Sequence, residues 1–349
     1  MAIKALEIVD LRCLKQCTWE PSDGLNVVVG QNGAGKTSLL EAVALAATSR
    51  ALRPGSARGA IAYGAERLKV QTQFGIGLKA GTLIYERSRT GRTWAMGCEA
   101  VRSPLTVYEC LPLLIFSPES HYATLQDPQV RRTAMQWLLF HVEPLFLDTW
   151  RRYQRILRQR NAALKSGDSL YRMFDPGLCQ VGEALARFWF DQQTALQQPF
   201  QEIAQRLELG LPVEMVLRPG WREGSLSEAL MASHSGDERL GYTQAGPHRA
   251  DIHFLLDGRP VQQVASHGQQ KVILSAWRLA LGQAVRRAGK EPILLVDDLA
   301  AELDRERRKA FYEVLITSQL QALVTAIESE PLPSSTAMFH VEQGCLRKP

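Results

Sequence analysis

The chain has 349 residues, 45% of them hydrophobic, and a formal net charge of +5 at pH 7. This length suits one large domain or two smaller ones, and the mild basic excess permits nucleic-acid binding without being diagnostic of it. The N-terminus has no charged leader before an apolar stretch, no segment reaches the roughly 18 uninterrupted apolar residues of a membrane span, and the six cysteines form no C-x-x-C pair. We therefore expect a cytoplasmic, reduced globular protein with no membrane partner and no disulfide framework.

The N-terminal part of the chain alternates between expected strands and one long helix. Strands are expected at Leu6–Leu11 and Leu25–Val29, a helix from Lys36, antiparallel strands between Lys69 and Trp94, and a short buried strand at Leu111–Phe116. The helix would bury Leu39, Leu40, Ala42, Val43 and Ala46. A strand that leads through a glycine-rich loop into a helix is the most informative local pattern here.

The composition changes at about Glu119, where long, charged, helix-prone stretches begin. Helices are expected at Val130–Phe140, Thr149–Lys165 and Leu178–Leu207, and strand-like segments at Pro212–Leu217, Asp251–Leu256 and Val261–Val264. A helix after Gly268 is followed by a strand at Ile293–Val296, a helix at Arg305–Ile316 and strands at Gln321–Ala326 and Ala337–Val341. We therefore expect a lobe I of residues 1–118 and 289–349, and a largely helical lobe II of residues 119–288.

The segment Gly30–Thr37 fits the pattern G-x-x-x-x-G-K-[ST] of a phosphate-binding loop. Lys36 would reach the β- and γ-phosphates of ATP, and the Thr37 hydroxyl would ligate Mg²⁺. The nucleotide-binding residues expected here are Gly30, Gln31, Asn32, Gly33, Ala34, Gly35, Lys36, Thr37 and Ser38. The alternative is a chance glycine-rich turn, but the preceding strand and following helix supply the context that the pattern needs.

Two carboxylates, Asp297 and Asp298, end the apolar strand Ile293–Val296. This arrangement would place Asp297 beside the phosphate-bound Mg²⁺, and Asp298 would orient or deprotonate the attacking water. The alternative is a pair that only ends a strand and caps a turn. ABC ATPases generally carry Glu at the second position, so the shorter Asp298 predicts slow hydrolysis.

A third pattern, Ser266-His267-Gly268-Gln269, precedes the expected helix after Gly268. In ABC-type ATPases such a segment closes over the ATP held by another subunit, so Ser266, Gly268 and Gln269 are added to the expected ATP contacts. The alternative is a helix that Ser266 merely caps. The loop Ala301–Asp304 fits the segment that these ATPases place at the dimer interface. Together the patterns predict an α/β, ABC-type P-loop ATPase head that forms a homodimer on ATP.

Further segments give a more specific resemblance. They are Gly30–Ser38 with Leu40–Ala42, Phe116–Glu119, Arg131-Arg132, Gln159–Ala162, Gly246–Arg249 with Asp251, Ser266–Lys271, Ile293–Asp298 with Glu302–Asp304, and Phe339–Gly344. Over essentially its whole length the chain resembles the RecF family of bacterial recombination mediators, although Ala250 and His267 depart from the residues usual there. The resemblance implies an SMC/Rad50-like head without a long coiled coil, DNA binding near single-strand/double-strand junctions, and work with RecR and RecO to load RecA at gaps.

The residues expected to contact DNA are arginines of the helical lobe II and of the segment that follows the first helix. Arg151, Arg155 and Arg158 share one helix face at 3.6 residues per turn, so that face could follow a phosphate backbone without reading sequence. Further candidates are Arg152, Arg160, Arg50, Arg53 and Arg58. A solvated, charged helix surface is the plain alternative.

The leading hypothesis is an ATP-switched DNA-binding protein of recombinational repair, which clamps DNA as a dimer and releases it on slow, DNA-stimulated hydrolysis. The alternative is the cytoplasmic ATPase subunit of a transporter. That class usually carries Leu-Ser-Gly-Gly-Gln and a switch His after the strand Gln321–Ala326, where this chain offers only Thr325 or Glu328. A chromosome-organising ATPase would need several hundred heptad-patterned residues that the chain cannot hold.

Overall fold

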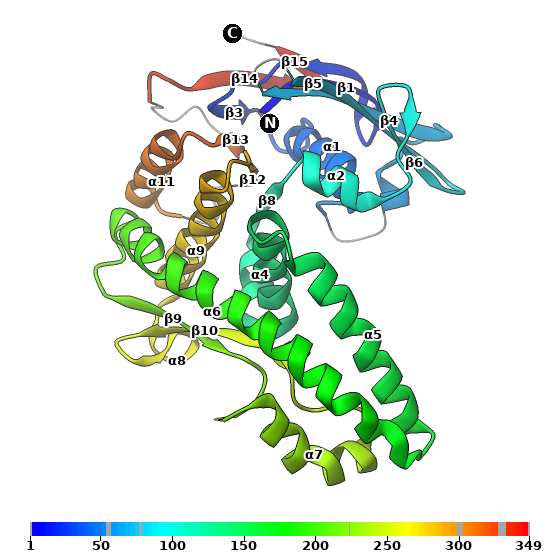
Figure 1. Ribbon diagram of the computed structural model, residues 1–349. Coiled ribbons are helices and arrows are strands. Elements are labelled where there is room, and N and C mark those ends of the chain that lie inside the picture. The colour runs from blue at the N-terminus through cyan, green and yellow to red at the C-terminus, as the bar shows by residue number, and fades with distance from the viewer. Residues whose placement is uncertain are drawn as a thin grey trace. The chain divides into compact units, whose positions relative to one another are not determined.

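The computed structural model describes residues 2–53, 57–76, 79–222, 224–298, 303–326 and 333–347. The chain forms two compact units. The first consists of Met1–His121, Arg206–Glu208 and Val285–Pro349, and the second of Tyr122–Gln205 and Leu209–Ala284. The first unit contains two six-stranded sheets, and the second contains long helices and a smaller sheet (Figure 1).

One sheet of the first unit carries the strand that leads into the phosphate loop. Its order is β15-β14-β3-β13-β12-β8, with parallel pairing throughout except between β14 and β15. The strands are β3 (Leu25–Val29), β8 (Leu113–Phe116), β12 (Ile293–Val296), β13 (Gln321–Ala326), β14 (Ala337–Glu342) and β15 (Cys345–Arg347). All residues of β3 and β12 are buried, which explains why β12 is a continuous apolar run and β3 is apolar apart from the buried Asn26. The parallel pairing brings the carboxyl ends of β3, β12 and β13 to the same edge.

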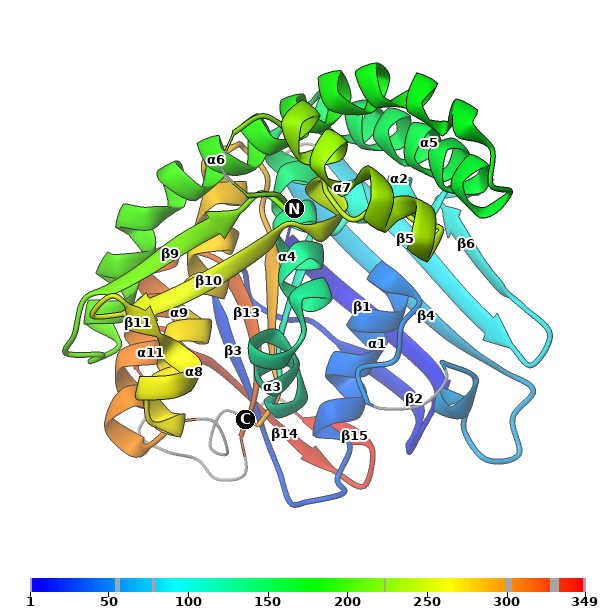
Figure 2. The same ribbon diagram turned by 90° about the horizontal axis from the view of Figure 1, so that it is seen from below.

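The second sheet is antiparallel, with order β2-β1-β4-β5-β6-β7. Its strands are β1 (Ala2–Leu11), β2 (Leu14–Trp19), β4 (Arg67–Ile76), β5 (Lys79–Ser88), β6 (Arg92–Met96) and β7 (Glu99–Ala100). Helix α1 (Lys36–Thr48) contacts β1, β4 and β5 of this sheet and β13 of the other, so it lies between the two sheets (Figure 2). Because it is covered on both sides, nearly all of its residues are buried, beyond the single face expected from the sequence.

Three further helical segments complete the part of the first unit that the structure describes. They are η1 (Ala57–Ala60), α2 (Pro104–Cys110) and α11 (Arg305–Ser318). Helix α11 contacts β3 and begins after Asp304, whose side chain accepts a hydrogen bond from the Arg307 amide. Helices α3 (Pro118–Gln126) and α9 (His267–Arg287) each run from one unit into the other along the chain.

The second unit combines long helices with a three-stranded sheet of order β11-β10-β9. Its elements are α4 (Pro128–Val142), α5 (Phe146–Lys165), η2 (Ser169–Phe174), α6 (Asp175–Arg206), β9 (Val213–Arg218), α7 (Leu226–Leu240), η3 (Pro247–Arg249), β10 (Asp251–Leu256), β11 (Arg259–Pro260) and α8 (Val261–Val264). The bidentate pair between Arg131 and Asp251, at 2.7 and 2.9 Å, ties α4 to β10.

The structure differs from the sequence-based predictions in several segments, including Val261–Val264 and helix α7. Val261–Val264 forms the single-turn helix α8 rather than a strand, because the strand ladder with β10 ends at Pro260 and the chain turns there. Helix α7 was not expected, since its apolar residues are sparse. A capping box, in which the Ser225 and Glu228 side chains bond each other's backbone amides, starts it, and that S-x-x-E pattern was the signal available in the sequence.

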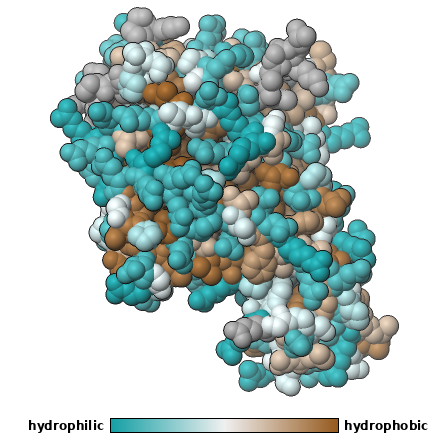
Figure 3. Space-filling model, turned by 60° about the vertical axis from the view of Figure 1, so that its left-hand side comes forward, coloured by the Kyte–Doolittle hydropathy of each residue, from teal (hydrophilic) through white to brown (hydrophobic). Residues whose placement is uncertain are grey.

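The described helices include none that is long and apolar enough to cross a membrane. On the face drawn in Figure 3, hydrophobic residues form patches interrupted by hydrophilic ones.

Candidate functional site

The phosphate loop joins β3 to α1 at the carboxyl end of the parallel sheet. Gly33 and Gly35 have φ angles of 83° and 117°, a region that residues with a side chain rarely adopt, so the loop needs glycine at both positions. Lys36, the first residue of α1, folds back and donates hydrogen bonds from Nζ to the carbonyl oxygens of Gly30 (2.7 Å) and Gln31 (3.1 Å). Burial lowers the pKa of Lys36, while the nearby Asp298 and Asp297 carboxylates oppose that shift.

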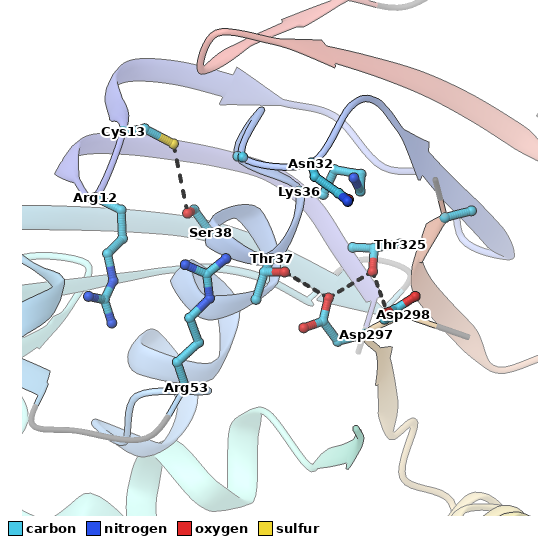
Figure 4. A pocket seen from close by; sticks show the side chains of 13 residues that line it. Arg12, Cys13, Asn32, Lys36, Thr37, Ser38, Arg53, Asp297, Asp298 and Thr325 are labelled. Atoms are coloured by element: carbon cyan, nitrogen blue, oxygen red, sulfur yellow. Dashed lines mark hydrogen bonds between the residues drawn. The ribbon is translucent and has the colours of Figure 1, made fainter. Parts of the chain in front are cut away.

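Asp297 is held between two threonine hydroxyls at the end of β12 (Figure 4). Thr37 Oγ1 and Thr325 Oγ1 both donate to its Oδ1 atom, at 3.0 and 2.7 Å. Burial raises the pKa of Asp297, and the hydrogen bonds from Thr325 and Thr37 oppose the rise. Three segments that are far apart in the sequence therefore present oxygen atoms at one point, which suits a hard cation such as Mg²⁺.

Asp298 follows in an unusual backbone conformation, with a φ angle of 52°. Its amide donates to Thr325 Oγ1 at 2.8 Å, and among the described residues its Oδ1 atom is buried with no hydrogen-bond partner. Asp and Asn tolerate this left-handed region better than Glu does, because their short side chains bond locally. The backbone thus gives a physical reason for Asp at a position where related ATPases carry Glu. Thr325 stands next to the pair, whereas Glu328 lies outside the described residues.

A cavity of about 330 Å³ surrounds these groups. It is lined by Arg12, Cys13, Asn32, Gly33, Gly35, Lys36, Thr37, Ser38, Arg53, Asp297, Asp298, Thr325 and Ala326. Of the expected phosphate-loop residues, it thus brings together Asn32, Gly33, Gly35, Lys36, Thr37 and Ser38 with both carboxylates. Gly30, Gln31 and Ala34 belong to the same loop but are not in its lining.

The cavity lining contains two arginines that the sequence did not predict there: Arg12 was not singled out, and Arg53 was expected to contact DNA. Arg12 was not singled out, because an arginine in a turn after a strand carries no local signal. Its guanidinium is fixed by the fully buried Glu41 carboxylate at 2.8 and 3.1 Å and by the Gly59 carbonyl at 2.7 Å. Arg53 was expected to contact DNA, but it lines this cavity and helps to stabilise the Asp297 carboxylate.

The residues that line the cavity are suited to binding a nucleoside triphosphate together with Mg²⁺. The volume lies at the lower end of the usual range for small-molecule sites, the loop amides and the N-terminus of α1 favour anions, and Lys36 and Arg53 supply positive charge, whereas the charge of Arg12 is balanced by Glu41. Thr37 and Asp297 would hold the metal, and the bound Mg²⁺ would neutralise charge on the phosphates.

Comparisons with known proteins agree with this geometry. Residues 5–118 match the family model described as the AAA domain. The DNA replication and repair protein RecF of Thioalkalivibrio sulfidiphilus is 38% identical over 357 residues, which cover 99% of both chains. The protein of the same name from Azotobacter vinelandii is 35% identical over 359 residues, which cover 99% of this chain and 98% of the relative. The chain belongs to the RecF family.

Solved structures support the same fold. A structure described as the recombination mediator protein RecF–ATP in the RecFOR pathway covers 99% of this chain and 97% of its own, with a TM-score of 0.84 and 22% identity. An Smc head domain derived from Pyrococcus furiosus has a TM-score of 0.63 at 15% identity, covering 99% and 95% of the two chains. The predicted α/β P-loop ATPase head and the resemblance to the RecF family are both confirmed.

In this RecF-family chain the signature residues Ser266, Gly268 and Gln269 belong to the second unit, whereas the phosphate loop belongs to the first. Ser266 is exposed, and its Oγ accepts a hydrogen bond from the Gln269 amide at 3.2 Å while Gln269 Oε1 accepts from the Ser266 amide at 2.9 Å. Ser266 therefore caps helix α9, as the alternative interpretation of this segment predicts. This capping leaves the Ser266 hydroxyl proton available to a phosphate oxygen, because a hydroxyl both donates and accepts. Of the loop expected at the dimer interface, Ala301 and Glu302 lie outside the described residues.

The arginines of α5 divide into two groups. Arg151, Arg152, Arg155 and Arg158 are exposed. Arg160 is not: its side chain is 0% exposed and bonds Asp175 and Asp237, each at 2.7 Å. The expectation that Arg160 contacts DNA is therefore wrong, because two carboxylates from α6 and α7 hold its charge inside the second unit.

Proposed function

We propose that this protein is an ATP-switched DNA-binding protein of recombinational repair with weak ATPase activity. The observation that carries the proposal is the meeting of Thr37, Asp297 and Thr325 beside the phosphate loop, in a chain that belongs to the RecF family. ATP with Mg²⁺ would bind in the cavity of the first unit. Hydrolysis would be slow, since Asp298 is shorter than the usual Glu, and DNA would stimulate it.

ATP would also control the oligomeric state. In the proposed dimer, Ser266, Gly268 and Gln269 of one subunit cover the γ-phosphate of the ATP held by the other, so that two nucleotides are sandwiched. The exposure of Ser266 and the positive end of α9 behind it support this role. The dimer would clamp duplex or gapped DNA near single-strand/double-strand junctions, and RecR and RecO would be its partners in loading the recombinase.

The proposal as a whole is tested by measuring mass and DNA affinity in the same samples. Light scattering behind a sizing column, with and without ATP and Mg²⁺, should show an ATP-dependent dimer. Filter binding of gapped DNA should show retention that rises with the dimer. If ATP changes neither the mass nor the DNA affinity, the proposed switch is wrong. The transporter alternative, which full-length similarity to the RecF family disfavours, predicts no ATP-dependent retention of DNA.

Ser266→Ala should separate the two nucleotide roles. We expect ATP affinity of the monomer within about twofold of the wild type, and dimerisation weakened by about 100-fold, because the symmetric dimer loses two charge-assisted hydrogen bonds that are each worth about tenfold. Fluorescent-ATP titration at low protein concentration gives the first quantity and light scattering the second. Ser266→Thr keeps the capping oxygen and the hydroxyl and should dimerise. Equal loss of both properties in Ser266→Ala would instead show that Ser266 serves its own nucleotide.

The exposed face of α5 is proposed as a DNA contact. Replacing Arg151, Arg155 and Arg158 together with Gln should weaken DNA binding and reduce the slope of log affinity against log salt by about 0.9 for each phosphate that the protein no longer neutralises. ATP binding should not change, because these residues lie outside the cavity. Arg172→Gln is the matched control, since Arg172 is an exposed arginine of the same unit that pairs with Glu238. An unchanged salt slope in the triple variant would show that this face of α5 does not contact DNA and is only a solvated surface.

A further inference from the structure

We propose that the hairpin formed by β14 and β15 is the positioning element of the phosphate loop, so that residues at the C-terminal end of the chain set the affinity for ATP. The inference rests on the proposed function, since it assumes that the loop binds nucleotide. It concerns Val341 and Gly344, neither of which lines the cavity. Both act through the backbone of the loop.

The first contact is with the start of the loop. Strand β14 pairs in parallel with β3 up to His340, which lies opposite Val29. The next residue along β14, Val341, lies against Gly30, and a Cβ atom added to Gly30 would meet the Val341 carbonyl oxygen. The Val341 side chain is buried, and its Cγ1 atom lies 3.5 Å from the point where a Cβ on Gly35 would be. Thus β14 continues beside the loop after the sheet pairing ends.

The second contact is a hydrogen bond from the hairpin turn. Gln343 and Gly344 form this turn with φ angles of 49° and 79°. The Gly344 amide donates to the Ala34 carbonyl oxygen at 2.9 Å. A Cβ atom on Gly344 would lie only 2.5 Å from the Cys13 carbonyl oxygen, in the turn between β1 and β2. The turn is therefore inserted between the phosphate loop and the β1–β2 turn with no room for a side chain.

This hydrogen bond fixes the orientation of one peptide plane. In a trans peptide the C=O and the following N–H point in opposite directions. Because the Ala34 carbonyl is held by Gly344, the Gly35 amide must point away from the hairpin, and Gly35 is one of the residues that line the cavity. The flexible glycine-rich loop could otherwise rotate this peptide and turn a carbonyl toward the phosphates. The hairpin thereby preserves a donor where the nucleotide needs one.

Gly344→Ala tests the proposal, and Gly258→Ala is its matched control. Asp257 and Gly258 form the turn between β10 and β11 with φ angles of 51° and 70°, so alanine meets the same backbone strain there. A Cβ on Gly258 would have no atom within 4 Å. We expect the Kd for a fluorescent ATP analogue to rise by about tenfold in Gly344→Ala, the effect of removing one hydrogen bond, and by less than about twofold in Gly258→Ala. Circular dichroism establishes that each variant is folded at the temperature used.

Hydrogen exchange of the wild-type protein gives an independent measurement that does not depend on a variant folding. ATP should slow exchange in a peptide that covers residues 337–347 and leave a peptide that covers residues 251–260 unchanged. Absence of ATP-dependent protection in the first peptide would overturn the proposal, as would a folded Gly344→Ala protein with wild-type ATP affinity. Either result leaves the proposed function intact if the wild type binds ATP. A wild type that does not bind ATP would overturn the proposed function itself.

Discussion

Lys36→Ala should abolish ATP binding, and with it ATP-dependent dimerisation and DNA retention. Lys36 is the one residue of the loop whose charge would reach the β- and γ-phosphates, and it is already buried beside Asp297 and Asp298. Charge-assisted hydrogen bonds to phosphate are among the stronger polar interactions, so we expect affinity to fall by about 100-fold or more. Titration with a fluorescent ATP analogue measures the affinity, and light scattering with filter binding measures the two dependent properties.

Lys4→Ala is the control for this experiment. Lys4 is an exposed lysine of the first unit that pairs with the exposed Asp23 and does not line the nucleotide cavity. Its removal takes away the same charge from the same unit and should leave all three properties unchanged. ATP-dependent dimerisation that survives in Lys36→Ala would contradict the switch, because it would uncouple dimerisation from the phosphate loop.

Asp298→Asn should leave ATP bound and the dimer formed, but reduce turnover by about 100-fold or more, the usual contribution of a positioned general base. The expected cause is removal of the carboxylate next to Asp297, the proposed metal ligand, while the left-handed backbone is preserved because Asn tolerates a φ angle of 52° as Asp does. Single-turnover hydrolysis measured beside ATP affinity separates chemistry from binding. The protein should then accumulate as an ATP-bound dimer on DNA.

Asp298→Glu tests whether the short side chain of Asp298 is the only cause of slow hydrolysis. If side-chain length alone limits the rate, Glu should accelerate hydrolysis toward that of related ATPases. We expect only part of that acceleration, because Glu fits the left-handed conformation less well and the amide of residue 298 must keep its bond to Thr325 Oγ1. If Asp298→Asn hydrolysed ATP at the wild-type rate, Asp298 would have no role in the hydrolysis step.

Sequence reasoning identified the parts of the site that local patterns encode. The phosphate loop lies between a buried strand and a helix, and Asp297-Asp298 ends another buried strand. In a parallel sheet such strand ends meet at one edge, so these residues could be expected to come together. The same reasoning failed for Val261–Val264, where a short run of four residues is equally compatible with a strand and with one turn of helix.

By itself the sequence determined the family, the fold class and the chemistry expected at Lys36, Thr37 and Asp297, because each rests on residue types at fixed local spacing. Only the tertiary structure decided what surrounds them. It placed Arg12 and Arg53 at the cavity proposed to bind ATP, buried Arg160 among carboxylates of two other helices, and set Gly344 against Ala34. These contacts join segments far apart in the chain, and such contacts leave no periodic signal in either segment. The burial of a charge depends on partners that only folding brings to it.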